Sequence, residues 1–396
     1  MDAKWISPKT IIGPVATGSF YYPRTEIVEE IWDELEKGNF ILIAAPRRVG
    51  KTSIMRDIEA NPRERFKVKF QNIQGVISKD DFYKMLYGLI LSCLKNSQKA
   101  KKWFEGYVKS KSITGISLEG GVTFEKVPLN YLDEINSVLG KFDKNTETVV
   151  LLIDELPEVL HRLNKNGKKD DAIAILNQLR TWRQSGYKLQ FVFAGSIGIH
   201  YVVKAIEGRT SGLNDLNKTI CNPLLDDEPD DYVSWATNGA TVQYSGKMKQ
   251  CLLEKIQSYY TPYFINLMLY EIDRKAKLRR DNVISESDVD EAFLNIIRNN
   301  DYFADWKSRL KEYMPKDEFN FVNEILIHIA HKDSIPVQII YDKAVRYDKQ
   351  TDYMDLLSDL MQDGYIVEDN EGSNNYVFVS PFLKAFWKRN NPIYHE

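Results

Sequence analysis

The feature that most constrains the fold is a short apolar run that leads through a tight turn into a helical pattern. Residues 40–44 (FILIA) are apolar throughout, which is typical of a strand buried on both faces of a sheet. The turn that follows ends in Gly50-Lys51-Thr52. A buried strand, a glycine-containing turn and a helix in this order indicate an α/β protein with a mostly parallel sheet.

Further segments fit the same architecture. Residues 66–72 (FKVKFQN) alternate between apolar and polar side chains, and residues 149–153 and 189–194 are again apolar. Residues 25–37 have helical spacing of apolar side chains and precede Gly38, which predicts a helix that ends just before the first strand. We therefore expect strands that alternate with helices.

Residues 45–53 (APRRVGKTS) have the composition of a phosphate-binding loop. In such a loop the backbone N–H groups and the helix N-terminus face phosphate oxygens, Lys51 reaches the β and γ phosphates, and the Thr52 hydroxyl binds Mg²⁺. Ala45 stands where the pattern GxxxxGK[ST] has its first glycine, whereas Gly50 is kept. The predicted ligands are ATP and Mg²⁺, and the predicted contact residues are Ala45, Pro46, Arg47, Arg48, Val49, Gly50, Lys51, Thr52 and Ser53.

Two acidic residues follow the apolar strand at 149–153. Asp154, at the strand end, is placed to hold Mg²⁺ together with Thr52, and Glu155 is placed to act as general base on the attacking water. An apolar strand that ends in two acids is often only a strand end. In combination with the Gly-Lys-Thr turn it predicts nucleotide hydrolysis.

Ser196 follows the strand at 189–194 and is a candidate for sensing the γ-phosphate or orienting water. The alternative interpretation is an ordinary turn that leaves a strand. Together with Lys51 and Glu155, Ser196 completes the predicted catalytic set.

Three arginines have open roles. Arg47 and Arg48 lie inside the loop, where one contacts phosphate or a neighbouring subunit and the other forms a structural ion pair, and the sequence does not say which. Arg209, in the segment GRTSG, is either an arginine finger that acts on a neighbouring subunit or a solvated loop residue.

The pattern of the chain changes after the last apolar strand. We predict a nucleotide-binding domain at 1–225, a helical domain at 226–312, and three helices followed by a hairpin at 318–396, which describe a winged helix. Residues 112–126 alternate around Gly-Gly and predict a β-hairpin inserted in the first domain. Its role is either structural or the binding of a partner.

The charge distribution bears on DNA binding. A winged helix that binds DNA offers basic residues on its third helix, because phosphate neutralisation supplies much of the affinity. Here the predicted third helix, 352–363, has four aspartates and no Lys or Arg, whereas Lys343, Arg346 and Lys349 lie on or just after the second helix. This favours a protein-contact or intramolecular role over recognition of DNA.

The overall composition restricts the class of protein. Lys and Arg total 53 against 56 Asp and Glu, a net charge of −3, so no global positive field attracts nucleic acid or an anionic membrane. Cys93, Cys221 and Cys251 are far apart and form neither a disulfide framework nor a zinc motif. The apolar runs are shorter than a membrane span, and the start of the chain lacks a signal-peptide pattern. We expect a cytoplasmic protein with no membrane segment.

The order of these motifs resembles the archaeal-type P-loop ATPases of the AAA+ and STAND groups. The resemblance implies an α/β P-loop NTPase sheet (AAA+-like), followed by an all-α lid that moves with nucleotide state and by a winged-helix domain. It also implies that Pro262 lies near the nucleotide base. The matching stretches, which span most of the chain, are Phe20 with Tyr22-Pro23-Arg24, residues 46–53 (PRRVGKTS), 151–156 (LLIDEL), 194–198 (AGSIG), NDL and NPL within 214–224, Thr261-Pro262-Tyr263, and Phe386-Trp387-Lys388-Arg389.

The predicted function is Mg²⁺-dependent ATP binding and hydrolysis, with ATP and ADP as ligands, that drives a conformational switch on a protein partner or in self-association. One alternative is a DNA-associated AAA+ factor, similar to origin-recognition initiators, that binds duplex DNA through the winged helix. Another is a scaffold that binds ATP without turnover.

Overall fold

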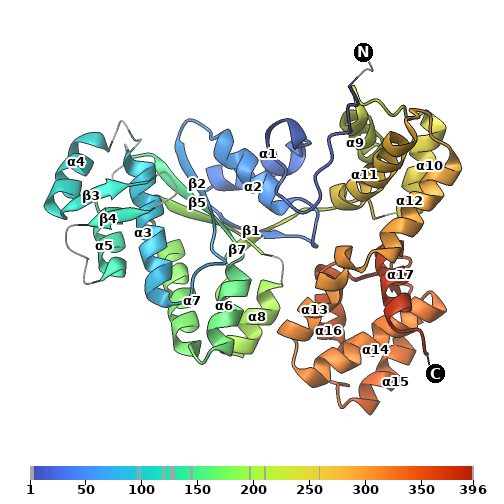
Figure 1. Ribbon diagram of the computed structural model, residues 1–396. Coiled ribbons are helices and arrows are strands. Elements are labelled where there is room, and N and C mark those ends of the chain that lie inside the picture. The colour runs from blue at the N-terminus through green and yellow to red at the C-terminus, as the bar shows by residue number, and fades with distance from the viewer. Residues whose placement is uncertain are drawn as a thin grey trace. The chain divides into compact units, whose positions relative to one another are not determined.

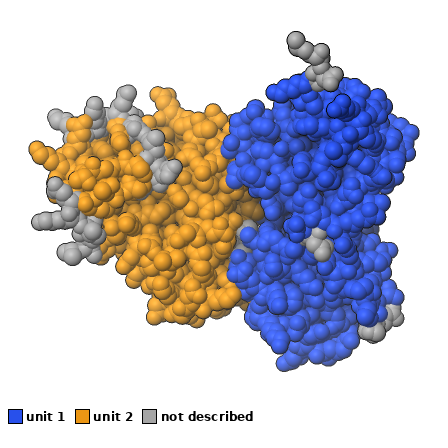
Figure 2. Space-filling model, in the orientation of Figure 1, with its two compact units in different colours: residues 1–22, 45–50, 222–396 blue, residues 23–44, 51–221 orange. Residues whose placement is uncertain are grey.

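The structure is a computed structural model that describes residues 4–95, 97, 100–117, 121–124, 130–142, 146–195, 198–208, 211–257 and 259–394. Its internal contacts divide the chain into two compact units, coloured separately in Figure 2. The sheet unit comprises residues 23–44 and 51–221, and the C-terminal unit comprises residues 1–22, 45–50 and 222–396. The loop at 45–50 therefore groups with the C-terminal unit, although the strand before it and the helix after it belong to the sheet unit.

Five parallel strands form the main sheet of the described residues, in the order β2-β5-β6-β1-β7. The central strands β5 and β6 are buried along almost their whole length, as their apolar sequences predict. The predicted parallel α/β sheet is confirmed, and β7 is an additional edge strand. The strands are β1 (Phe40–Ala44), β2 (Phe66–Asn72), β5 (Thr148–Asp154), β6 (Leu189–Ala194) and β7 (Leu216–Ile220).

Helices cover both faces of this sheet (Figure 1). The connection from β1 to β2 runs across the sheet in one direction, and the connections from β2 to β5, β6 and β7 return in the other. Because parallel crossovers are right-handed, α2 lies on one face and the helices of the returning connections lie on the opposite face. The helices of this unit are α1 (Thr25–Glu36), α2 (Lys51–Ala60), α3 (Lys79–Lys95), α4 (Lys101–Ser110), α5 (Tyr131–Leu139), α6 (Leu156–Lys165), α7 (Lys169–Gln184) and α8 (Ile199–Glu207), with a 3-10 turn at Ser211–Leu213.

A short antiparallel pair lies between α4 and α5, within the region of the predicted hairpin. Strands β3 (Ile113–Ile116) and β4 (Val122–Phe124) pair with an irregularity between Ile113 and Gly115. Residues 118–120 and 125–129 lie outside the described residues. The Phe124 ring stacks on Tyr87 of α3, with ring centroids 6.2 Å apart, so the pair packs against the sheet unit.

The C-terminal unit begins with five helices that follow β7. The N-terminal segment of the chain packs on them: the Trp5 indole donates to Asp273 at 3.0 Å, and Asn266 donates to the carbonyl of Ile11 at 3.1 Å. The helices are α9 (Glu228–Thr237), α10 (Gly246–Ile256), α11 (Pro262–Arg279), α12 (Glu286–Arg298) and α13 (Ala304–Tyr313), and 3-10 turns lie at Gly18–Phe20 and Asn300–Tyr302.

The last part of the C-terminal unit contains three helices and a hairpin in the predicted order, together with a short strand after the first helix and a further helix after the hairpin. The three strands form an antiparallel sheet in the order β8-β10-β9. The predicted domain boundaries near 225 and 312–318 remain predictions. The elements are α14 (Lys316–Lys332), β8 (Ile335–Pro336), α15 (Val337–Arg346), α16 (Tyr353–Gln362), β9 (Ile366–Glu368), β10 (Asn375–Phe378) and α17 (Pro381–Asn390).

None of the helices in the described part of the chain is both long enough and apolar enough to span a membrane.

Candidate nucleotide-binding site

The loop at 45–50 connects the carboxyl end of β1 to the first residue of α2, as the sequence predicts. Gly50 has φ +105°, a conformation that L side chains rarely adopt, which explains glycine at this position. Arg48 is also left-handed, with φ +65°. The chain thereby turns sharply into a helix whose N-terminal N–H groups favour an anion. Lys51, the first residue of this helix, is 8% exposed.

Thr52 and Asp154 lie in direct contact. The Thr52 hydroxyl donates to Asp154 Oδ2 at 2.7 Å, although the two residues are 102 positions apart. Asp154 is 2% exposed, and burial raises the pKa of its carboxyl, an effect that the hydrogen bond from Thr52 offsets only in part. A buried carboxylate with a raised pKa would be stabilised in its ionised form by a nearby cation. The structure thus brings together the two residues predicted to bind Mg²⁺.

This pair fits the ligand chemistry of Mg²⁺. A hydroxyl and a carboxylate are hard oxygen donors, and Mg²⁺ is commonly bound through one or two such groups together with substrate phosphates and water. A set of three or more His, Cys, Asp or Glu side chains suited to a metal is absent from the described residues. The oxygen donors of Thr52 and Asp154 fit this ligand chemistry.

Glu155 directly follows the end of β5 in an unusual backbone conformation. Its φ of 67° and ψ of 28° are left-handed, and its N–H donates to the carbonyl of Ala194, at the end of β6, at 2.9 Å. The same N–H also donates to Asp154 Oδ1 at 3.1 Å. A non-glycine residue in this region is under conformational strain and is held there by its surroundings. Ser196 and Arg209 lie outside the described residues, so their predicted roles remain predictions.

Arg47 forms the ion pair that the sequence predicted for one of the two loop arginines. Its Nη2 atom donates to Asp305 Oδ2 at 2.6 Å, and its guanidinium lies 5.0 Å from the ring centroid of Trp306. The Arg47 side chain is 7% exposed and that of Asp305 is 50% exposed. Its other terminal nitrogen, Nη1, is buried and has no hydrogen-bond acceptor among the described residues.

Arg48 has a different environment. Its guanidinium lies 4.6 Å from the ring centroid of Tyr263. Burial lowers the pKa of this guanidinium, and its Nε is buried without an acceptor among the residues that the structure describes. The aromatic face compensates part of the desolvation of the cation, but an anion would compensate more.

Pro46 packs against the turn between α16 and β9. A Cβ atom placed on Gly364, which has φ +77°, would lie 2.6 Å from Pro46 Cβ and 2.8 Å from the Tyr259 hydroxyl. Gly364 therefore permits a close approach of the loop. Of the other predicted contact residues, Val49 is buried, whereas Ala45 and Ser53 are half-buried. Pro262 begins α11, next to the N-cap Thr261.

The sequence analysis did not identify four of these partners, namely Tyr263, Asp305, Trp306 and Gly364. All four lie more than 200 residues from the loop in sequence, and of these only Tyr263 belongs to a matching stretch, Thr261-Pro262-Tyr263. The sequence contains only indirect evidence for these contacts. Two adjacent arginines in a loop that is partly buried need counter-charges or aromatic rings from other parts of the chain, because burial of an unpaired charge is costly.

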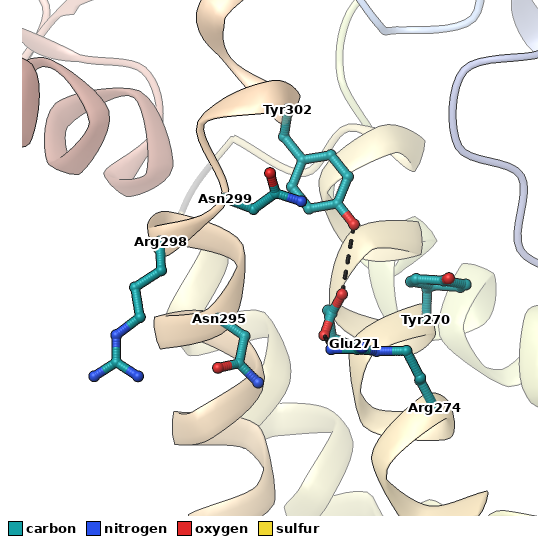
Figure 3. A pocket seen from close by; sticks show the side chains of 7 residues that line it. All are labelled: Tyr270, Glu271, Arg274, Asn295, Arg298, Asn299 and Tyr302. Carbon is teal, nitrogen blue, oxygen red and sulfur yellow. Dashed lines mark hydrogen bonds and ion pairs between the residues drawn. The ribbon is translucent and has the colours of Figure 1, made fainter. Parts of the chain in front are cut away.

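A cavity of about 490 Å³ is lined by residues of α11, of α12 and of the turn that follows α12 (Figure 3). Its side chains are polar, and the buried Glu271 carboxylate accepts from Arg274 at 2.7 Å and from the Tyr302 hydroxyl at 3.4 Å. None of the residues that line it was predicted to bind nucleotide. They are Tyr270, Glu271, Arg274, Asn295, Arg298, Asn299 and Tyr302.

Comparisons with known proteins bear on the fold. No protein-family profile matches the sequence, and no curated protein matches it either. Among solved structures, the chain is similar to the Walker-type ATPase PAby2304 of Pyrococcus abyssi, with 17% identity over 95% of this chain and 98% of that chain and a TM-score of 0.60. The fold is that of a P-loop ATPase. A second similar structure of this class is the Aeropyrum pernix ORC2 protein, with 13% identity over 96% and 95% of the two chains and a TM-score of 0.52.

Proposed function

We propose that this protein binds Mg²⁺-ATP and hydrolyses it. The observation that carries the proposal is the 2.7 Å hydrogen bond between Thr52 and Asp154, because it joins the hydroxyl after Gly50-Lys51 to the buried carboxylate at the end of β5. These two groups are the donors that a P-loop nucleotide site offers to Mg²⁺. The P-loop ATPase fold supports the same assignment.

Each residue then has a stated role. Lys51 and the N–H groups at the start of α2 bind the phosphates, and Thr52 and Asp154 hold the metal. When bound, Mg²⁺ neutralises charge that develops on the phosphates. Glu155 is the general base that accepts a proton from the attacking water. Ser196 contacts the γ-phosphate, and Pro262 lies near the base.

The two structural neighbours support a nucleotide ligand. PAby2304 is described as a Walker-type ATPase, and the ORC2 structure as ADPNP-ADP complexes. For this chain a nucleotide of the same chemistry is proposed on the residues above.

We further infer that the energy of hydrolysis drives a conformational switch on a protein partner rather than on DNA. The basic side chains on or just after the second helix of the predicted winged helix are engaged in ion pairs. Lys343 is 2% exposed and pairs with Glu324 at 2.6 Å, and Arg346 lies 3.5 Å from the same carboxylate. Lys349 pairs with Asp317. Because these cations already have counter-charges, they offer little of the counterion release on which DNA affinity depends.

The test is phosphate release from ATP by the wild-type protein and by Glu155→Gln, with and without Mg²⁺ and with and without duplex DNA. We expect Mg²⁺-dependent turnover in the wild type, a strong loss in Glu155→Gln, and no stimulation by DNA. Nucleotide binding is followed separately from the shift in melting temperature with Mg²⁺-ATP, which Glu155→Gln should keep. A wild-type protein that shows neither a shift at millimolar nucleotide nor turnover would refute the proposal.

Stimulation by duplex DNA that falls with salt would instead assign the partner as nucleic acid. Binding without turnover in the wild type would favour the scaffold alternative.

A further inference from the structure

The loop arginines and the start of α13 contain buried N–H groups that find no hydrogen-bond acceptor within the described part of the chain. We propose that Asp305 is a positioning residue for nucleotide binding: it fixes Arg47 so that the loop presents the remaining N–H groups of Arg47 and Arg48 to phosphate. This inference rests on the proposed function and names a residue, far from the loop in sequence, on which that function depends.

The first step concerns Arg47, whose position requires a counter-charge. Its side chain is 7% exposed, and a guanidinium withdrawn from water to this extent is costly unless it is paired. Asp305 supplies the charge through one hydrogen bond of 2.6 Å to Nη2, and the Trp306 ring supplies an aromatic face at 5.0 Å. Asp305 and Trp306 are adjacent in α13, so one helix end fixes both the charge and the orientation of Arg47.

The second step concerns the atoms that remain. Arg47 Nη1, Arg48 Nε and Trp306 Nε1 are buried and have no hydrogen-bond acceptor among the described residues. All three are donors, and buried donors in native structures are normally satisfied. A phosphate chain supplies several strong acceptors, and guanidinium groups match phosphate geometry well. The unpaired donors therefore point to an anionic ligand.

The third step is the local charge. The Asp305 carboxylate interacts with two further guanidinium groups in addition to that of Arg47. It lies 3.6 Å from Arg309 Nε, and the charge of Arg48 also acts on it. Burial alone would raise the pKa of Asp305, but the hydrogen bond and charge of Arg47 and the charges of Arg309 and Arg48 lower it overall. The ionised Asp305 carboxylate thus lies among the guanidinium groups of Arg47, Arg48 and Arg309.

Whether Asp305 strengthens or weakens nucleotide binding depends on which N–H groups it accepts from. Asp305 accepts from Nη2 of Arg47 but not from Nη1, and none of the described hydrogen bonds joins it to Arg48. It therefore holds the loop in place without consuming the donors that phosphate would use. Removal of its charge should weaken nucleotide binding, whereas a carboxylate that competed with phosphate would have the opposite effect.

The experiment compares Asp305→Asn with a matched control, Asp290→Asn. Asp290 also pairs with a cation at 2.6 Å, that of Lys255, and its side chain is 53% exposed against 50% for Asp305. We expect Asp305→Asn to raise the Kd of Mg²⁺-ATP and Mg²⁺-ADP about tenfold, as for loss of a partly buried charge pair, and to raise KM more than it lowers kcat. Asp290→Asn should leave both near wild type.

Two further variants separate positioning from a loss of folding. Asp305→Glu keeps the charge and should restore most of the affinity, and combining Asp305→Asn with Arg47→Ala should cost little more than Arg47→Ala alone, because both changes remove the same contact. Melting without nucleotide monitors the fold. Equal Kd values for Asp305→Asn and Asp290→Asn, or tighter binding by Asp305→Asn, would overturn the inference while wild-type binding still upheld the proposed function. Absence of binding by the wild type would refute the proposed function and, with it, this inference.

Discussion

Asp154 in the sheet unit and Asp305 in the C-terminal unit have opposite electrostatic environments. Asp154 is almost fully buried, its carboxylate accepts from the Thr52 hydroxyl and the Glu155 N–H, and its carboxyl pKa is raised. Asp305 is half-exposed among guanidinium groups, and its carboxyl pKa is lowered. Burial outweighs the stabilising contacts at Asp154, whereas neighbouring cations outweigh burial at Asp305.

The variant with the largest expected effect is Lys51→Ala. Lys51 begins α2 at 8% exposure, directly after the left-handed Gly50, and is the cation proposed to bind the β and γ phosphates. Its loss should weaken Mg²⁺-ATP binding by roughly 100-fold or more, as expected for a buried charge pair, and abolish the nucleotide-dependent rise in melting temperature. Titration calorimetry measures the affinity directly.

The matched control for this variant is Lys255→Ala, which removes a lysine of α10 that pairs with Asp290. It should bind nucleotide normally. If Lys51→Ala also bound normally, Lys51 would not be a phosphate ligand. The raised pKa of Asp154 would then be no indication of a nucleotide-bound metal beside it.

Most of the sheet and the position of Asp154 could be predicted from the sequence, because they depend on patterns within short segments. The apolar runs at 40–44, 149–153 and 189–194 correspond to β1, β5 and β6, and the residues proposed for the metal follow β5 and the Gly-Lys turn. Strand β7 was not predicted, since LNKTI has few apolar residues and only two of its five positions are buried. An edge strand of this kind depends on pairing with its neighbour more than on its own pattern.

The contacts of the loop at 45–50 with the helices of the C-terminal unit could not be predicted in the same way. Nothing near Arg47 in sequence indicates Asp305, 258 residues away, and the Gly-Tyr at 364–365 is an ordinary start of a strand. The choice between Arg47 and Arg48 for the ion pair was open in the sequence for this reason. Contacts of such long separation arise from packing of the whole C-terminal unit, and no periodicity within a helix or strand encodes them.

Gly364→Ala tests whether the loop depends on its contact with the turn between α16 and β9, and we expect an intermediate effect. An added Cβ would lie 2.6 Å from Pro46 Cβ, in a backbone conformation with φ +77°. We expect a loss of about 2 kcal/mol in unfolding free energy from the conformation and the contact together, and Mg²⁺-ATP binding weakened several-fold because Pro46 must shift.

The control is Gly372→Ala, which has a similar φ of +73° but open space around the added atom. It should cost about 1 kcal/mol from the backbone alone and leave nucleotide affinity unchanged. Equal effects of the two variants on affinity would show that the loop and the α16–β9 turn are energetically independent, and Asp305 would then act alone.

The smallest expected effect is the pH dependence of stability that Asp154 contributes without nucleotide. Its folded-state pKa is raised above the ordinary value of 3.8, mainly by burial. The folded state therefore binds this proton more tightly than the unfolded state, so the contribution of Asp154 to stability is fully present below pH 3.8 and is lost as pH rises through the raised pKa. This pH dependence of stability is opposite in sign to that of Asp305 and of most paired carboxylates, so only the difference between wild type and Asp154→Asn isolates it.

Denaturant unfolding of both proteins between pH 4 and 7 should show the wild type losing stability relative to the variant as pH rises. Saturating Mg²⁺-ATP, which binds the ionised carboxylate, should reverse that trend, and a difference independent of pH would mean that Asp154 already has its cation within the fold.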